Sequence, residues 1–365
     1  MIKKLNVMYN GKLVGYLLET NDGRIAFQYD DEWIKHGFSI SPFSLPLTNK
    51  VFINTKQTFD GLYGVFNDSL PDGWGELLVR RMLVKKEINP DSLSPIQKLT
   101  IISNNALGAL TYKPNNPIEK KTIIDINLDE IANEANAILN DDNNTKNLDQ
   151  IYMLGGSSGG ARPKAHITID NEEWIVKFPC YMDSKNIGEQ EYTANKLAKK
   201  CGINVNDFKL FPSKICSGYF GVKRFDRKDN NKRVHMISLS ALLETTHRIP
   251  NLDYTHLFQV IQNICPNKDE IYEAYRRMCF NVLYKNRDDH GKNFSFIYDE
   301  NINGYRLSPA YDLTSTPNKF EHEMTVNGNG LPTEKDLLDI AHKFKLSLST
   351  CTNIISTIKN ILKIK

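Results

Sequence analysis

The most informative segment of this chain reads Tyr284-Lys285-Asn286-Arg287-Asp288-Asp289-His290-Gly291-Lys292-Asn293-Phe294. Two carboxylates, a histidine, a lysine and an amide stand there between short apolar runs, and packing alone rarely needs such a set. A polar loop with an Asx-turn is the plain structural alternative. The rest of the chain decides between that alternative and a catalytic loop.

The spacing of Asp288 and Asn293 matches the catalytic loop of kinases. In that loop an aspartate accepts the proton of the acceptor hydroxyl and an asparagine holds magnesium. A third oxygen ligand is then expected nearby, and Asp312 in Ser308-Pro309-Ala310-Tyr311-Asp312 supplies it. A strand at residues 294–298, a turn at 301–304 and a strand at 305–307 would return Asp312 to the side of Asn293.

Composition indicates an ordinary globular chain. With 365 residues and 40% hydrophobic content, it can bury a large core and should divide into two or three subdomains. The six cysteines are widely spaced without a C-x-x-C pair, which favours a reduced, cytoplasmic protein. No export signal or membrane span is expected. A net charge of +3 is too small to predict a nucleic-acid surface, and the basic tail from Lys359 is typical of a solvated helix end.

The first thirty residues predict an antiparallel meander. Asn10-Gly11 is a strong two-residue hairpin turn between strands at residues 7–9 and 14–18. Asn21-Asp22-Gly23 then turns the chain into a third strand at residues 24–29. Residues 39–54 contain two prolines and favour an extended edge over a helix.

A turn-rich aromatic segment, Phe66-Asn67-Asp68-Ser69-Leu70-Pro71-Asp72-Gly73-Trp74-Gly75, precedes a helix predicted at residues 76–84. We expect this segment to cap the helix and to pack Trp74 into a cleft. A direct catalytic role is disfavoured because neither Asp68 nor Asp72 has a nearby partner of suitable chemistry. After it, residues 114–121 predict a linker, residues 128–139 an amphipathic helix and residues 141–147 a polar loop.

A glycine-rich loop follows in Leu154-Gly155-Gly156-Ser157-Ser158-Gly159-Gly160-Ala161-Arg162-Pro163-Lys164, ahead of a strand at residues 165–169. Its glycines allow backbone amides to approach phosphates closely. It is neither a Walker A nor a Rossmann sequence, and a merely flexible loop is the alternative. A hairpin with Lys177 in its apolar second strand follows, as in the small lobe of a kinase.

Lys177 would contact nucleotide phosphates, held by a carboxylate on the next helix, at residues 187–201. Glu191 is the first candidate for that carboxylate and Glu189 the second. The alternative is a lysine that extends to solvent from an edge strand.

We expect the hinge segment that binds adenine to lie in the chain between Lys177 and the catalytic loop. A strand at residues 218–224 and a strand-to-helix passage at residues 233–243 place Met236 and Ser238 where adenine could bind. Residues 271–285 form a helix that ends before Asp288, and residues 332–344 and 349–363 predict two further helices. Thr333 and Asp336 form a capping box on the first of these two.

These motifs are similar to those of the HipA-type serine/threonine kinases, toxins of bacterial toxin–antitoxin modules. The resemblance covers nearly the whole chain. It is most specific at Gly159-Gly160-Ala161-Arg162-Pro163-Lys164, at Asn286 through Phe294 and at Ser308 through Asp312, and residues 66–72 resemble the family's N-terminal subdomain.

The resemblance implies a role for each matching residue. Asp288 would be the catalytic base, Asn293 and Asp312 would hold Mg²⁺, and these three form the predicted catalytic set. Ser157, or Ser158 beside it, would be autophosphorylated. The residues assigned to ATP binding are Gly159, Gly160, Ala161, Lys164, Lys177, Glu191, Met236, Ser238, His290 and Lys292.

The implied fold is α+β and bilobal, like a protein kinase. It would have an N-terminal β-rich subdomain (residues 1–115), an ATP-binding lobe (122–235) and a mainly helical C-terminal lobe (236–365). The implied partners are a HipB-like helix-turn-helix antitoxin, operator DNA through it, and a protein substrate, in some members an aminoacyl-tRNA synthetase. Two rival functions stay open, a small-molecule kinase and an antitoxin-binding co-repressor with little catalysis.

Overall fold

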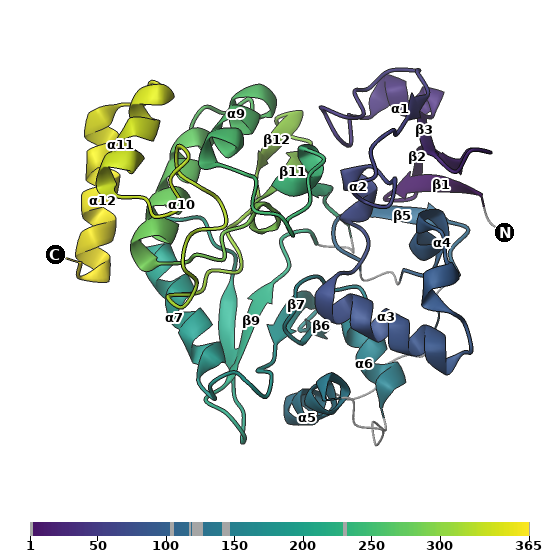
Figure 1. Ribbon diagram of the computed structural model, residues 1–365, viewed down its shortest axis with the longest axis horizontal. Helices are drawn as coiled ribbons and strands as arrows, with labels where there is room; N and C mark the ends of the chain where they lie inside the picture. Colours follow the sequence, from purple (N-terminus) through teal and green to yellow (C-terminus); the bar gives the residue numbers. More distant parts are fainter. Residues whose placement is uncertain are drawn as a thin grey trace. The chain divides into compact units, whose positions relative to one another are not determined.

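The computed structural model describes residues 3–102, 106–116, 118, 127–140, 147–228 and 232–364, and the chain divides into two compact units (Figure 1). The first unit comprises Met1–Glu189, Phe208–Ile237 and Ala241–Thr245, and the second comprises Gln190–Asp207, Ser238–Ser240 and Thr246–Lys365. Within the described ranges, no helix is both long and apolar enough to cross a membrane.

The first unit begins with a five-stranded sheet of order β4-β3-β2-β1-β5. Its antiparallel strands are β1 (Lys4–Tyr9), β2 (Lys12–Glu19), β3 (Ile25–Tyr29), β4 (Phe52–Ile53) and β5 (Leu110–Lys113). Asn10 and Gly11 join β1 to β2 with φ of 46° and 83°, the left-handed conformation that a two-residue hairpin turn requires. The predicted meander is therefore confirmed.

Short helices follow that sheet: α1 (Asp31–His36), α2 (Gly64–Asn67), α3 (Gly73–Lys85), the 3-10 turn η1 (Pro90–Ser92) and α4 (Pro95–Thr100). The helix predicted at residues 76–84 is α3, which starts three residues earlier. Trp74 in its first turn is 1% exposed and packs with Leu78 and Met82 in one hydrophobic cluster. The prediction that Trp74 serves packing is confirmed.

A second sheet in the first unit has the order β6-β7-β9-β8. Its strands are β6 (Lys164–Ile169), β7 (Glu172–Lys177), β8 (Phe208–Phe211) and β9 (Tyr219–Lys223), all antiparallel. Helices α5 (Leu128–Leu139) and α6 (Leu148–Gly155) share the cluster of Trp74 with this sheet, and α3 and α6 lie side by side (Figure 1). The α5 bounds match the prediction, whereas α6 was not predicted. Most of the predicted linker at residues 114–121 and of the loop at 141–147 lies outside the described residues.

The second unit is mainly helical, as predicted for the end of the chain. It contains most of α7 (Ile187–Lys200), then α9 (Tyr254–Ile264), α10 (Glu270–Tyr284), η3 (Gly291–Asn293), α11 (Glu334–Lys343) and α12 (Leu348–Leu362), with α10, α11 and α12 grouped together (Figure 1). Helix α9 was not predicted. The capping box of Thr333 and Asp336 is present at the start of α11.

A three-stranded sheet of order β10-β11-β12 accompanies these helices. Its members are β10 (Met236–Ser238), β11 (Ser295–Asp299) and β12 (Gly304–Leu307), and the chain continues from β10 into α8 (Leu239–Leu242). The predicted strand-turn-strand after Asn293 is therefore confirmed as the β11–β12 hairpin. Sheets and helices together confirm the predicted α+β class.

Candidate functional site

The predicted site residues belong to both units. The glycine-rich loop, Lys177 and Met236 lie in the first unit, whereas Glu191, Ser238 and the segment around Asp288 lie in the second. The residues therefore form two sets, one for each unit. The set in the first unit begins with the loop that follows α6.

The glycine-rich loop leaves α6 with both serines turned inward. Ser158 is 1% exposed, and its hydroxyl donates to the Gly155 carbonyl oxygen at 2.6 Å. Ser157 is 3% exposed, and among the described residues its hydroxyl has no hydrogen-bond partner. Gly160, by contrast, is exposed and has a φ of 81°, which glycine adopts without the strain that a side chain would add. The loop thus buries its serines and presents its second glycine pair to solvent.

The start of α3 holds this loop from the N-terminal side. The Gly160 N–H donates to a carboxylate oxygen of Asp72, and the Trp74 N–H donates to the Gly160 carbonyl at 2.9 Å. The Trp74 indole N–H donates to the Lys164 carbonyl at 3.1 Å. The partner of Asp72 is thus a backbone amide, which holds the loop, and the expectation that Asp72 has no direct catalytic role stays a prediction.

Two glycines make this close contact possible. A Cβ atom at Gly75 would lie 2.2 Å from the Ser158 carbonyl oxygen, and one at Gly73 would lie 2.5 Å from the Gly160 carbonyl oxygen. Both distances are too short for a real carbon–oxygen contact, so any other residue would push the loop away from α3. The two glycines of Asp72-Gly73-Trp74-Gly75 indicate a close backbone approach, but they do not identify the segment that approaches.

Two lysines stand beside the loop on neighbouring strands. Lys164 and Lys177 are Cα partners across the β6–β7 ladder, so their side chains leave the same face of the sheet. The Lys164 ammonium donates to the Gly159 carbonyl, and the Lys177 ammonium lies 5.7 Å from the centroid of the Phe220 ring. Like charges opposite each other on a sheet are unfavourable unless an anion joins them. The β6–β7 ladder therefore places two positive charges on one face of the sheet, one of them bonded to the loop.

The two predicted hinge residues, Met236 and Ser238, belong to different units. Met236 is partly buried in the first unit, where a Cβ atom on Gly108 would lie 3.0 Å from its Cγ atom, and Ser238 is buried in the second. His235, directly before them, is fully buried, and its Nε2 lies 2.9 Å from the Ile40 carbonyl oxygen. The adenine-binding role of Met236 and Ser238 stays a prediction.

In the second unit, α10 delivers the chain into the predicted catalytic loop. Lys285 ends the helix in the left-handed conformation, with φ of 59°, and the Asn286 N–H donates to the Asn281 carbonyl at 2.9 Å. The Asn286 side chain is buried and donates to Asn281 Oδ1 at 3.0 Å. This cap turns the chain sharply and fixes the residues that follow.

Burial separates the two adjacent carboxylates. Asp289 is 1% exposed and accepts hydrogen bonds from the Tyr254 hydroxyl at 2.7 Å, from His322 Nδ1 at 2.8 Å and from the Glu323 N–H at 3.1 Å. The side chain of Asp288 is 41% exposed. Asp289 therefore anchors the loop from inside, and Asp288 is the carboxylate that an incoming hydroxyl can reach.

The segments of Asn293 and Asp312 lie side by side. The Tyr311 hydroxyl donates to the Lys292 carbonyl at 2.5 Å and also lies 2.5 Å from the Ser295 hydroxyl. The amide nitrogen of Asn293 donates to the Asp288 carbonyl at 2.7 Å, which orients the Asn293 side chain. One carboxylate and one amide oxygen are hard donors of the kind Mg²⁺ takes when phosphates supply further ligands. Among the described residues, no three acidic, histidine or cysteine side chains form a cluster that could hold a metal ion.

His290 and Glu191 are the next two predicted ATP-binding residues of the second unit, and both are partly or fully buried. The His290 ring lies 5.2 Å from the His247 ring, centroid to centroid, and its buried Nδ1 has no hydrogen-bond partner among the described residues. Glu191 is 4% exposed near the start of α7, and its carbonyl accepts from the Asn195 side chain at 2.9 Å. The pairing of Glu191 with Lys177 stays a prediction.

One residue near Asp288 was missed by sequence reasoning. The Lys319 ammonium donates to Asp288 Oδ1, and it also donates to Glu323 Oε1 at 2.7 Å. Lys319 follows Asp288 by 31 residues, and no motif marks it.

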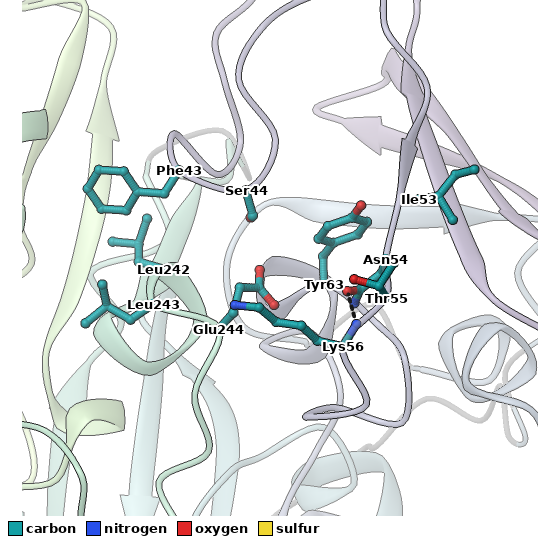
Figure 2. Close-up of a pocket in the computed structure, with 10 residues that line it drawn as sticks. All are labelled: Phe43, Ser44, Ile53, Asn54, Thr55, Lys56, Tyr63, Leu242, Leu243 and Glu244. Atoms are coloured by element: carbon teal, nitrogen blue, oxygen red, sulfur yellow. Dashed lines mark hydrogen bonds between the residues drawn. The ribbon is translucent and has the colours of Figure 1, made fainter.

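The first unit also contains a pocket of about 380 Å³ (Figure 2). Its lining residues are Phe43, Ser44, Ile53, Asn54, Thr55, Lys56, Tyr63, Leu242, Leu243 and Glu244. Both carboxylate oxygens of Glu244 accept from the Gly64 N–H, at 3.0 and 3.1 Å. Burial raises the pKa of Glu244. The lining includes none of the predicted site residues.

Comparison with known proteins identifies two matching family models. The model described as the HipA-like C-terminal domain matches residues 156–364, and the one described as the HipA N-terminal domain matches residues 5–113. Two curated relatives from Sinorhizobium fredii are named "Putative kinase Y4dM" and "Putative kinase Y4mE". The first is 24% identical over 88% of this chain and 79% of its own length, and the second is 23% identical over 86% and 78%.

Among solved structures, the chain is similar to HipA of Shewanella oneidensis MR-1, determined in a complex with HipB and its operator DNA. The TM-score is 0.71 at 19% identity, over 98% of this chain and 89% of that one. This likeness confirms the predicted fold.

Proposed function

Because this chain belongs to the HipA family, we propose that it is an ATP- and magnesium-dependent serine/threonine protein kinase that acts as the toxin of a cytoplasmic toxin–antitoxin module. The observation that carries the proposal is the contrast between Asp288 and Asp289. A buried, three-fold hydrogen-bonded carboxylate fixes the loop, and its neighbour is left accessible to a substrate hydroxyl. General-base catalysis in a kinase loop needs one carboxylate that the substrate hydroxyl can reach and a loop that is held in a fixed position.

Lys164 and Lys177 support the nucleotide part of this proposal. Their ammonium groups leave one face of the sheet beside exposed Gly160 and Ala161. Phosphate oxygens placed there would accept hydrogen bonds from the ammonium groups and from the loop amides. His290 and Lys292 are the second unit's residues to which this proposal gives a part in ATP binding.

Asn293 and Asp312 would hold Mg²⁺ in this proposal, and the ion would supply charge neutralisation for the transferred phosphoryl group. The protein's own contribution is orientation. Tyr311 ties the Asp312 segment to Lys292, and the backbone of Asp288 holds the Asn293 amide. Asp288 accepts the proton of the serine or threonine hydroxyl as that oxygen bonds to the phosphorus.

Autophosphorylation belongs to the same proposal, and Ser157 is its site, with Ser158 as the alternative. A phosphate adds about −1.5 to −2 charges and three oxygens, which a side chain only 3% exposed has no room or solvent to accommodate. Modification would therefore require the loop to leave its contact with α3, and ATP affinity should fall.

The proposed partner is a HipB-like antitoxin that binds this kinase and operator DNA together. The Shewanella HipA complex contains such an antitoxin and its operator. A small-molecule kinase and a co-repressor with little catalysis are the competing functions.

A labelling experiment tests the proposal. Purified full-length protein is incubated with labelled ATP and a lysate of its host, and labelled proteins are identified by mass spectrometry. Wild type should label protein serines or threonines as well as Ser157, whereas Asp288→Asn should label neither. Asp269→Asn, an exposed aspartate before α10, is the matched control and should behave as wild type. Label confined to small molecules would support the small-molecule kinase, and unchanged labelling by Asp288→Asn would refute the assignment of the base.

A further inference from the structure

Lys319 is bound to the carboxylate that the proposed mechanism uses. Its ammonium bridges Asp288 and Glu323, and its side chain is 39% exposed, so the group is reachable by a ligand. Exposed ion pairs contribute only about 0–1 kcal/mol to stability. Stability therefore gives little reason for a lysine at this position, and a role in chemistry is the better explanation.

The segment that carries Lys319 is fastened to the catalytic loop on both sides. Before it, the Thr316 N–H donates to the Lys285 carbonyl at 2.9 Å, and the Thr316 hydroxyl accepts from the Arg287 N–H at 2.8 Å. After it, His322 Nδ1 and the Glu323 N–H both contact the buried Asp289 carboxylate. These contacts position the backbone on both sides of Lys319, and Asp288 and Glu323 hold its ammonium.

The charge of Lys319 is secure at neutral pH. Partial burial alone would lower the pKa of the ammonium, but hydrogen bonds to Asp288 and Glu323 raise it above its ordinary value. Charge spreads over the phosphoryl oxygens during transfer, and a fixed cation aimed at them stabilises the transition state more than the ground state. Because Lys319 bonds to Asp288, a substrate hydroxyl bonded to the same carboxylate would lie next to the Lys319 ammonium.

We propose that Lys319 is a further catalytic residue that contacts the transferred phosphoryl group, with Glu323 as the positioning residue that holds it. This inference rests on the proposed kinase function. In the step, the acceptor oxygen bonds to the terminal phosphorus of ATP and its proton passes to Asp288. The bond from that phosphorus to the bridging oxygen breaks, and ADP leaves with those electrons. Lys319 exchanges no proton.

Steady-state kinetics of the full-length protein test this role. Lys319→Met should lower kcat by about 100-fold, the cost of removing one donor aimed at the transition state, with the KM for ATP changed less than about threefold. Lys319→Arg should restore most of kcat, because it returns the charge. Glu323→Gln should lower kcat by less than Lys319→Met does. The matched control is Lys335→Met, which removes an exposed lysine from α11 and should leave kcat unchanged.

The outcomes separate this inference from the proposed function. Wild-type kcat in Lys319→Met, with Asp288→Asn inactive, would overturn the role of Lys319 and leave the kinase assignment standing. An arginine variant as slow as the methionine variant, or a loss of kcat that follows a lower Tm and weaker ATP binding, would show a structural role instead. Turnover in Asp288→Asn would remove the proposed function itself.

Discussion

Replacing Asp226 by asparagine should destabilise the first unit strongly. The Asp226 carboxylate is 4% exposed and pairs at 2.8 Å with both Arg224 and Arg227, whose side chains are 0% and 10% exposed. It also accepts from the Gly108 N–H at 2.7 Å, and both arginines donate to the Ala106 carbonyl. This cluster therefore ties residues 106–108 to the end of β9.

The magnitude follows from what the substitution leaves behind. Asparagine keeps the shape of aspartate but removes the charge, so two buried guanidinium groups lose their counter-ion. Breaking a buried pair in this way costs about 3–5 kcal/mol. For a unit of this size, each kcal/mol lowers Tm by about 2–4 °C. We expect Tm of Asp226→Asn to fall by roughly 6–20 °C.

Tryptophan fluorescence is the appropriate assay. All three tryptophans of the chain, Trp33, Trp74 and Trp174, are buried in the first unit, so their emission reports its unfolding in urea. Asp22→Asn is the matched control, because Asp22 pairs with Arg24 while their side chains are 54% and 45% exposed. This exposed pair is screened by solvent, so Asp22→Asn should leave the urea midpoint almost unchanged. An Asp226→Asn protein within 1 kcal/mol of wild type would refute the reasoning.

Four further predictions concern His235, Asp226, Gly75 and Asp312. Burial lowers the pKa of His235 to about 4. Below pH 6.5 the unfolded chain therefore binds a proton that the folded unit does not bind, and stability should fall by about 2 kcal/mol between pH 7.5 and pH 5. Urea midpoints of His235→Gln should show a smaller loss over the same pH range. Asp226 should not contribute in that window, because Arg224 and Arg227 outweigh burial and hold its pKa far below the usual range, so its stabilisation is lost only below about pH 4. Gly75→Ala should cost about 1–3 kcal/mol by overpacking against Ser158 and should weaken ATP binding in a nucleotide titration; an unperturbed urea midpoint would contradict the close contact. Asp312→Asn should weaken magnesium-dependent nucleotide binding, since an amide is a poorer ligand than a carboxylate, and an unchanged magnesium titration would remove Asp312 from the site.

Local sequence determined the elements whose stabilising partners lie a few residues away. The Asn10-Gly11 turn, the α5 helix and the capping box of Thr333 and Asp336 were all predictable, because their hydrogen bonds and backbone angles are set by near neighbours. The spacing of Asp288 and Asn293 was informative for the same reason, since one short turn fixes both residues. The amphipathic helix α9 was within reach of the same reasoning and was missed.

Only the tertiary structure decided which chemical groups meet. Asp72 finds the Gly160 amide across 88 residues, and Lys319 finds Asp288 across 31, through contacts that no local pattern encodes. The spacing to Asn293 distinguished Asp288 from Asp289 in the sequence, but it did not predict which of the two carboxylates is buried. Tyr254 and His322, brought in from other parts of the second unit, bury one and leave the other exposed. Burial and long-range hydrogen bonding depend on the path of the whole chain. Here they decide that Asp289 is buried and that Asp288 is exposed.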